Sequence, residues 1–246
     1  MQVIMIAGKA GSGKTTLAKI LAKHVYNHGL VPILASFAGP LKEEAKEKGY
    51  DKELFPEKYR EFCQKLGASA REGNPDHWVD LMRERMKSVK EEEAESIEGK
   101  SKFWERCVII DDCRYLNEIN LGIEMNASIL FLTTGRRGLK EHDWRSHESE
   151  SLANDVEEGN KELIDLFDHI IFNDRDERYL DDRIQDMVPV WCGMSANPEK
   201  EGSLLCNCKN CREERLFGLT PKQQAIEDFL DMLGMFEEED DDEETY

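Results

Sequence analysis

A glycine-rich segment near the N-terminus limits what this chain can fold into more than any other feature. Residues 8–15, GKAGSGKT, fit the pattern G-x-x-x-x-G-K-[ST]. Residues 3–7 before it are apolar, as in a buried strand, and residues 16–22 after it repeat apolar positions at helical spacing. This order of strand, loop and helix predicts a loop whose backbone N–H groups bind phosphate. The alternative is a glycine-rich turn that matches the pattern by chance.

The residue types in this loop suit the triphosphate end of a nucleotide. Lys14 would reach the β- and γ-phosphates, and the Thr15 hydroxyl would take a place on Mg²⁺. We therefore expect ATP as co-substrate, with Mg²⁺. The expected ATP-binding residues of the loop are Gly8, Ala10, Gly11, Ser12, Gly13, Lys14, Thr15 and Thr16.

Further along the chain, apolar runs alternate with helical patterns. Strand patterns cover residues 30–37, 107–112, 127–132 and 168–173. Such alternation predicts parallel β-α-β units, and so an α/β fold. Ligands of such sheets bind at the carboxyl ends of the strands.

Residues 57–86 form a helical insertion between the second and third strands. Its pattern predicts one helix that breaks at Gly67, a loop over residues 71–76, and a second helix from about Asp76. We expect this insertion to cover an acceptor site.

Several polar residues follow strand patterns and should meet at the same edge of the sheet. Residues 37–42, FAGPLK, follow the second strand, and the third ends in Asp111 and Asp112, with Arg114 two residues later. Asp112 would serve Mg²⁺ or the acceptor, and Arg114 a phosphate. Beyond the fourth strand lies a basic loop, which would close as an arginine clamp or stay a solvated surface loop. Its cations are Arg136, Arg137, Lys140 and Arg145.

The pattern changes after residue 187, which is the expected end of a nucleotide-binding domain, 1–187. A Cys-rich extension and helix would occupy 188–236, and an acidic disordered tail 237–246. Four cysteines of the extension would hold a structural zinc ion, or else are free thiols. They are Cys192, Cys206, Cys208 and Cys211.

The net charge of −19 argues against an extended nucleic-acid surface. Eight negative charges lie in the run 237–244, so the rest of the chain still carries −11. The chain has no run of about 18 apolar residues and no cleavable signal pattern, so we expect a cytoplasmic protein without a membrane segment. Seven cysteines fit reduced thiols or metal ligation better than a disulfide framework.

Together, these segments resemble the phage-type deoxynucleoside monophosphate kinases of the P-loop NMP-kinase-like group. The resemblance spans residues 1–187 and lies in the order of GKAGSGKT, FAGPLK, CQKLGASAREGNPDHWV, VIIDDCRYLNE and the arginine loop leading into SHESE. It implies an α/β fold of the P-loop NTPase type, with three layers, α/β/α, around a five-stranded parallel sheet. It also implies ATP-dependent phosphoryl transfer to a (deoxy)nucleoside monophosphate, giving the diphosphate, in the host cytoplasm if the protein is viral.

The resemblance also implies roles for individual residues. The catalytic residues would be Lys14, Asp112 and Arg137, and Arg136 would contact ATP. Thr15 and Asp112 would hold Mg²⁺. The substrate-binding residues would be Phe37, Lys42, Arg71, Trp78, Arg114, Glu118 and His147.

Two other functions stay open. One is a kinase of another small phosphorylated acceptor, similar to those acting on phosphomevalonate or dephospho-coenzyme A. The other is a zinc-containing, nucleic-acid-handling ATPase. A GTPase is disfavoured, because Asp112 is followed by Cys-Arg-Tyr and no N-K-x-D base-reading motif occurs. The sequence leaves the accepted base and sugar open, and a homodimer remains an alternative to a monomer.

Overall fold

A computed structural model describes residues 1–51, 54–97, 105–134, 148–173 and 176–193. The first half of the chain forms β1 (Gln2–Ala7), α1 (Lys14–Asn27), β2 (Val31–Ala35), α2 (Gly39–Glu47), α3 (Pro56–Gly73) and α4 (His77–Ile97). The second half forms β3 (Arg106–Cys113), α5 (Leu116–Glu124), β4 (Ser128–Thr133), η2 (Glu148–Glu150), α6 (Ser151–Glu157), α7 (Lys161–Ile164), β5 (His169–Phe172), α8 (Glu177–Ile184) and α9 (Val188–Trp191). Among these elements, no helix is both long and apolar enough to cross a membrane.

The five strands form one parallel sheet in the order β2-β3-β1-β4-β5. This confirms the predicted α/β class and the five parallel strands. Strand β1 lies at the centre, with β3 on one side and β4 on the other. The segments that follow these three strands therefore share one edge of the sheet, which is where parallel sheets bind ligands.

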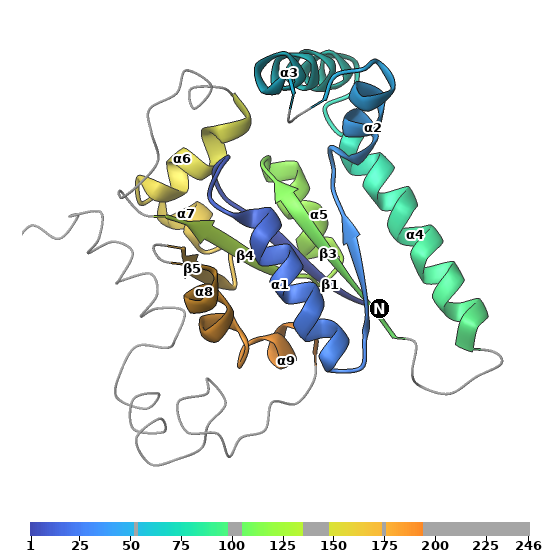
Figure 1. Ribbon diagram of the computed structural model, residues 1–246, viewed down its shortest axis with the longest axis vertical. Helices are drawn as coiled ribbons and strands as arrows, with labels where there is room; N and C mark the ends of the chain where they lie inside the picture. The colour runs from blue at the N-terminus through green and yellow to red at the C-terminus, as the bar shows by residue number, and fades with distance from the viewer. Residues whose placement is uncertain (52–53, 98–104, 135–147, 174–175, 194–246) are drawn as a thin grey trace, which may run out of the picture.

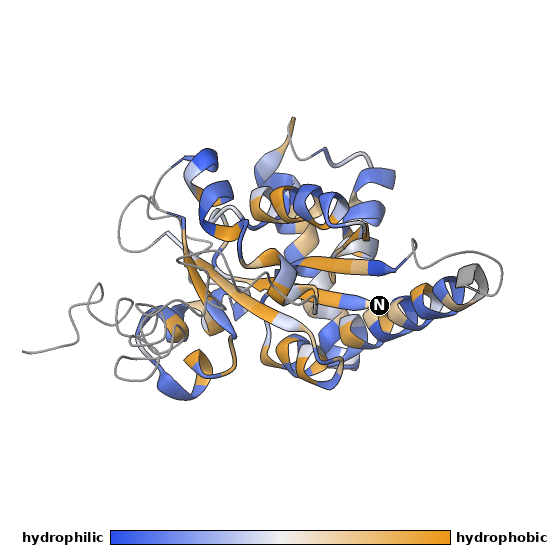
Figure 2. Cartoon of the chain, turned by 90° about the horizontal axis from the view of Figure 1, so that it is seen from below, coloured by the Kyte–Doolittle hydropathy of each residue, from blue (hydrophilic) through white to orange (hydrophobic). Residues whose placement is uncertain are grey.

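Helices cover both faces of the sheet (Figure 1). Successive side chains of β1 point to opposite faces, so Val3 and Met5 pack with α4 and α5, whereas Ile4 and Ile6 pack with α1, α8 and α9. The strands are apolar over most of their length, and the helices are apolar on one side only (Figure 2). A sheet buried on both faces in this way accounts for the continuous apolar runs in the sequence.

The helical insertion differs from the prediction at Gly67. Helix α3 continues through this residue to Gly73, so Arg71 lies in the last turn of α3 and not on a loop. Gly67 is buried, and a Cβ there would lie 3.3 Å from Leu41 Cδ1 of α2. The glycine thus permits close packing of α2 against α3. Figure 1 shows both helices at the top of the view, beyond the carboxyl ends of the strands.

The packed core extends beyond the predicted boundary at residue 187. Val188, Trp191 and Cys192 are buried in the cluster that contains α1 and α8. The boundary shifts because the sequence Val188-Pro189-Val190-Trp191 forms the short helix α9, with its proline in the first turn, where no backbone N–H is needed. The remainder of the predicted extension, from residue 194, lies outside the described residues.

We expect Gly122→Ala to lower the free energy of unfolding by about 1–3 kcal/mol, because overpacking strains a core. A Cβ at Gly122 on α5 would lie 2.5 Å from the buried Met5 Sδ and 3.1 Å from Ile129 Cδ1. Gly73→Ala is the control, since no heavy atom lies within 4 Å of a Cβ there. Denaturant unfolding that shows equal stabilities for the two variants would contradict this packing.

Candidate functional site

The glycine-rich loop turns so closely against the sheet that side chains are excluded at two positions. Gly8 has φ of 137°, and a Cβ there would lie 2.2 Å from the Leu132 carbonyl oxygen of β4. Gly13 caps α1 with φ of 98°, and a Cβ there would lie 2.4 Å from Asn173 Nδ2. The loop therefore delivers its backbone to the N-terminus of α1, where unpaired N–H groups favour an anion.

Lys14 is held inside this loop. Its Nζ donates to the carbonyl oxygens of Gly8 at 2.7 Å and Lys9 at 2.6 Å. Burial, followed by the positive charge of Arg114, lowers the pKa of Lys14 from 10.5 to about 8. A phosphate placed in the loop would raise the pKa of Lys14 again, because its negative charge would favour the charged ammonium.

The two consecutive carboxylates at the end of β3 face opposite sides of the sheet. Asp111 points toward α1, where its Oδ2 accepts a hydrogen bond from Thr15 Oγ1 at 2.9 Å. Asp112 points toward the α2 side. The pairing of β1 with β3 shifts by one residue between Met5 and Ala7, so a bulge in β3 lies at these two acids.

Asp112 organises the turn that follows β2. Its carboxylate accepts hydrogen bonds from the Phe37 N–H at 2.8 Å and the Ala38 N–H at 3.1 Å, and it also binds the Ser36 hydroxyl. Lys42 Nζ lies 3.3 Å from the same carboxylate. With four donors around it, Asp112 holds the turn, and Asp111 is the carboxylate beside Thr15. This arrangement does not support the prediction that Asp112 shares a metal ion with Thr15.

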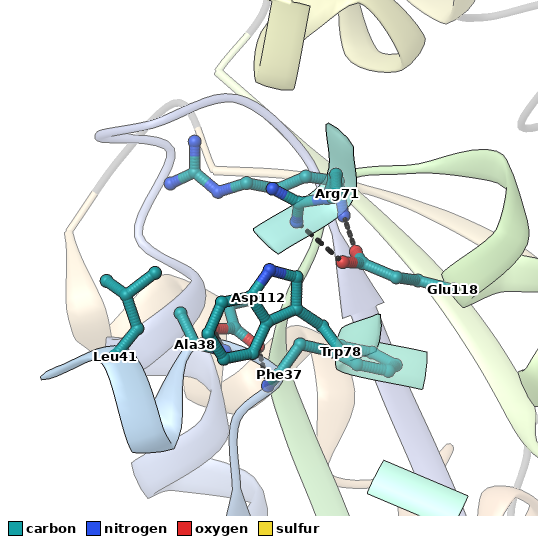
Figure 3. Close-up of a pocket in the computed structure, with 8 residues that line it drawn as sticks. Phe37, Ala38, Leu41, Arg71, Trp78, Asp112 and Glu118 are labelled. Carbon is teal, nitrogen blue, oxygen red and sulfur yellow. Dashed lines mark hydrogen bonds and ion pairs between the residues drawn. The ribbon is translucent and has the colours of Figure 1, made fainter. Parts of the chain in front are cut away.

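A pocket that is open to solvent lies at the same edge of the sheet. It brings together six of the predicted substrate-binding or catalytic residues, and Ala38 and Leu41 complete the lining. The six are Phe37, Arg71, Trp78, Asp112, Arg114 and Glu118. In Figure 3, Arg71 and Glu118 point toward one another on one side of the pocket, and Leu41 and Ala38 lie on the other. Lys42 adjoins it through Asp112, and the walls are mostly apolar.

Arg71 is fixed by three neighbours. Its Nη1 donates to the Gly67 carbonyl oxygen at 3.2 Å, and its Nη2 lies 3.6 Å from Glu118 Oε1. The guanidinium also lies over the Tyr115 ring, 3.9 Å from the ring centroid. A stacked and paired guanidinium of this kind is ready to bind a planar or tetrahedral oxyanion.

Glu118 lies beneath the arginines rather than in the open part of the pocket. It is 3% exposed, and its Oε2 accepts from the backbone N–H groups of Arg114 at 2.7 Å and Tyr115 at 3.1 Å. Burial raises the pKa of Glu118 from 4.5 to about 7, and the Arg114 N–H opposes that rise. Its contacts make it a support for Arg71 and for the start of α5.

The structure adds two residues to which the sequence prediction gave no role. Glu150 Oε2 accepts from the Ala10 N–H at 2.8 Å, and Asn173 Nδ2 donates to the Ser12 carbonyl oxygen at 2.8 Å. Asn173 directly follows β5, and this position could have indicated it. Glu150 belongs to the SHESE segment, but no local pattern links it to a loop 140 residues away.

The remaining predicted residues divide into two groups. Thr16 is half-buried in the first turn of α1, and Cys192 is buried with its Sγ 4.0 Å from Cys107 Sγ. Cys192 thus lies in the core. Arg136, Arg137, His147, Cys206, Cys208 and Cys211 lie outside the described residues. Within the described part of the chain, no three His, Cys, Asp or Glu side chains gather as a metal site.

Comparison with protein-family models and with curated proteins finds no match for this chain. A functional assignment therefore depends on the geometry and chemistry of the residues themselves.

The buried Glu118 should make stability depend on pH. Its folded-state pKa lies above that of an unfolded glutamate, so the folded state binds the proton more tightly. The free energy of unfolding should thus fall as pH rises from about 4.5 to about 7, by about 3 kcal/mol from this group. We expect Glu118→Gln to remove this contribution in urea unfolding at several pH values, and Glu43→Gln, at an exposed position of α2, to retain it. Parallel pH profiles for wild type and Glu118→Gln would contradict the assignment.

Proposed function

We propose that the protein transfers the γ-phosphoryl group of ATP to a (deoxy)nucleoside monophosphate and releases the two diphosphates. The observation that carries this proposal is the juxtaposition of a phosphate loop with a second, arginine-bearing pocket at the same sheet edge. Glu150 contacts both the Ala10 N–H of the loop and Arg114 of the pocket. Two adjoining anion sites are what a transfer between two phosphates requires.

The donor half would use the loop and the start of α1. Lys14 would exchange its two carbonyl partners for phosphate oxygens, and the N-terminus of α1 would add backbone N–H groups. The Thr15 hydroxyl and the Asp111 carboxylate are hard oxygen ligands 2.9 Å apart, which fits Mg²⁺ bound with few protein ligands. When bound there, Mg²⁺ would neutralise charge on the β- and γ-phosphates.

The acceptor half would use the pocket. Arg71 and Arg114 would bind the monophosphate, because forked guanidinium groups match phosphate oxygens. The side chains of Phe37, Leu41 and Trp78 would pack against the sugar or base. Asp112 would hold the turn bearing Phe37, and Glu118 would hold Arg71. The roles of Arg136 and Arg137 as an arginine clamp remain predictions from the sequence.

One observation favours a second class of acceptor. The polar side chains of the pocket already have partners among the described residues: Asp112 has four donors, Glu118 has two N–H groups and Arg71, and Trp78 Nε1 donates to Gly67 O at 3.4 Å. This leaves little hydrogen-bonding capacity to distinguish one base from another. A small phosphorylated acceptor without a base is therefore the nearest rival.

A panel of acceptors tests the proposal. ADP release should depend on a nucleoside monophosphate and exceed the release seen with water, DNA or phosphomevalonate. Lys14→Ala should remain folded and lose at least about a hundredfold in kcat, since such sites act through positioning and electrostatics. Lys19→Ala, an exposed lysine further along α1, is the control. Equal ADP release with every acceptor, or normal transfer by Lys14→Ala, would refute the proposal.

Substitutions of the two acids of β3 should change different kinetic constants. Asp111→Asn should raise the Mg²⁺ concentration needed for half-maximal activity, because the carboxylate beside Thr15 loses its charge. Asp112→Asn should raise the acceptor KM, because the Phe37 turn loses its anchor. The substitutions are chemically identical and at adjacent positions, so each controls for the other. Steady-state kinetics with Mg²⁺ and acceptor varied separately measures both constants. Equal or reversed effects of the two substitutions would contradict these roles.

A further inference from the structure

Glu150 is a buried carboxylate at the boundary between the two proposed subsites. The residue is 2% exposed and ends the short turn η2, directly before α6. Leu152 and Ala153 of α6 are buried in the core, so the backbone that carries Glu150 is anchored. A carboxylate this deeply buried is costly unless both of its oxygens have partners.

The two oxygens of Glu150 bind different parts of the site. Oε2 accepts from the Ala10 N–H of the phosphate loop at 2.8 Å, and Oε1 pairs with Nη1 of Arg114. Arg114 Nη1 also lies 3.5 Å from Ser149 Oγ on the same turn. One side chain thus spans from the loop of β1 to the arginine that follows β3.

The Glu150 carboxylate also offsets the electrostatic repulsion between two cations. Arg114 lies close enough to Lys14 for its charge to lower the pKa of the lysine. Repulsion between these groups would drive the longer and more exposed arginine away from the loop. Glu150 attracts both cations, and so keeps Arg114 beside the loop in the absence of substrate.

An alternative is that Glu150 occupies the place of a phosphate and leaves when nucleotide binds. The contacts of Lys14 oppose this. A carboxylate in the place of a phosphate should accept from Lys14, the cation that would bind that phosphate. Lys14 instead donates to the carbonyls of Gly8 and Lys9. Moreover, the Glu150 side chain is 3% exposed, so it would have to leave a buried position to make way for a phosphate.

We propose that Glu150 is a positioning residue that ties Arg114 to the phosphate loop and so sets the distance between acceptor and donor phosphates. The inference rests on the proposed function for the terms donor and acceptor. Glu150 does not contact substrate. It acts through Arg114, whose guanidinium it holds in the orientation that binds the acceptor phosphate.

The kinetic test uses Glu150→Gln in the full chain, which keeps the shape and removes the charge. The acceptor KM at saturating ATP should rise about tenfold, the loss typical of one charge-assisted hydrogen bond, while the ATP dissociation constant changes less than about threefold. Glu148→Gln, an exposed position on the same turn, should match wild type. An unchanged or lower acceptor KM for Glu150→Gln would overturn the proposal, and a lower one would identify the carboxylate as a phosphate stand-in.

A double-mutant cycle separates positioning from general structural damage. If Glu150 acts through Arg114, Glu150→Gln should add little to the acceptor KM of Arg114→Ala. Fully additive effects, together with a lowered melting temperature, would show a structural role only and overturn the proposal.

A third measurement does not depend on catalysis. In the protein without nucleotide, guanidinium ¹⁵N resonances report how fast the Arg114 guanidinium group rotates. Rotation should be slow in wild type and in Glu148→Gln, and fast in Glu150→Gln. The signal that is missing in Arg114→Lys identifies the Arg114 resonance. An identical Arg114 signal in all variants would overturn the tether. Absence of phosphoryl transfer to any monophosphate by wild type would instead count against the proposed function alone.

Discussion

The site depends on the opposite orientation of two adjacent carboxylates at the end of β3. Alternation along a strand sends Asp111 to the α1 face, where it meets Thr15, and Asp112 to the α2 face, where it meets the N–H groups of Phe37 and Ala38. One strand end thereby connects the glycine-rich loop with a turn that lines a pocket. The central place of β1, between β3 and β4, brings the remaining loops to the same edge.

Local pairing explains how a protein of net charge −19 can hold cations together at one edge of the sheet. Lys14 binds loop carbonyls, and Arg71 and Arg114 each lie beside a buried acid, Glu118 and Glu150. Each of these cations is therefore held in place before a substrate arrives. In the proposed reaction, phosphates would then meet donors that are already oriented, and preorganisation of this kind is a main way in which active sites promote phosphoryl transfer.

The sequence predicted the helices and strands better than the contacts between residues that are far apart in the chain. Apolar periodicity located all five strands, because a doubly covered sheet needs continuous apolar runs. Alternation along β3 could also have placed Asp111 on the same face as Ile109, toward α1, had it been applied to the last two residues. The contact of Glu150 with Ala10 joins positions 140 residues apart, and only the packing of η2 and α6 against the loop creates it. The strand order arises in the same way, from long-range packing that local patterns do not encode.

Gly67 shows why the error at α3 matters for function. In sequence it looks like a helix break, yet the helix continues because the missing side chain lets Leu41 of α2 approach closely. The carbonyl of Gly67 then receives both Arg71 Nη1 and Trp78 Nε1. Gly67 therefore helps to position both the Arg71 guanidinium and the Trp78 ring, which line the pocket. The geometry of the pocket thus depends on the packing of α2 against α3 at Gly67 as well as on polar contacts.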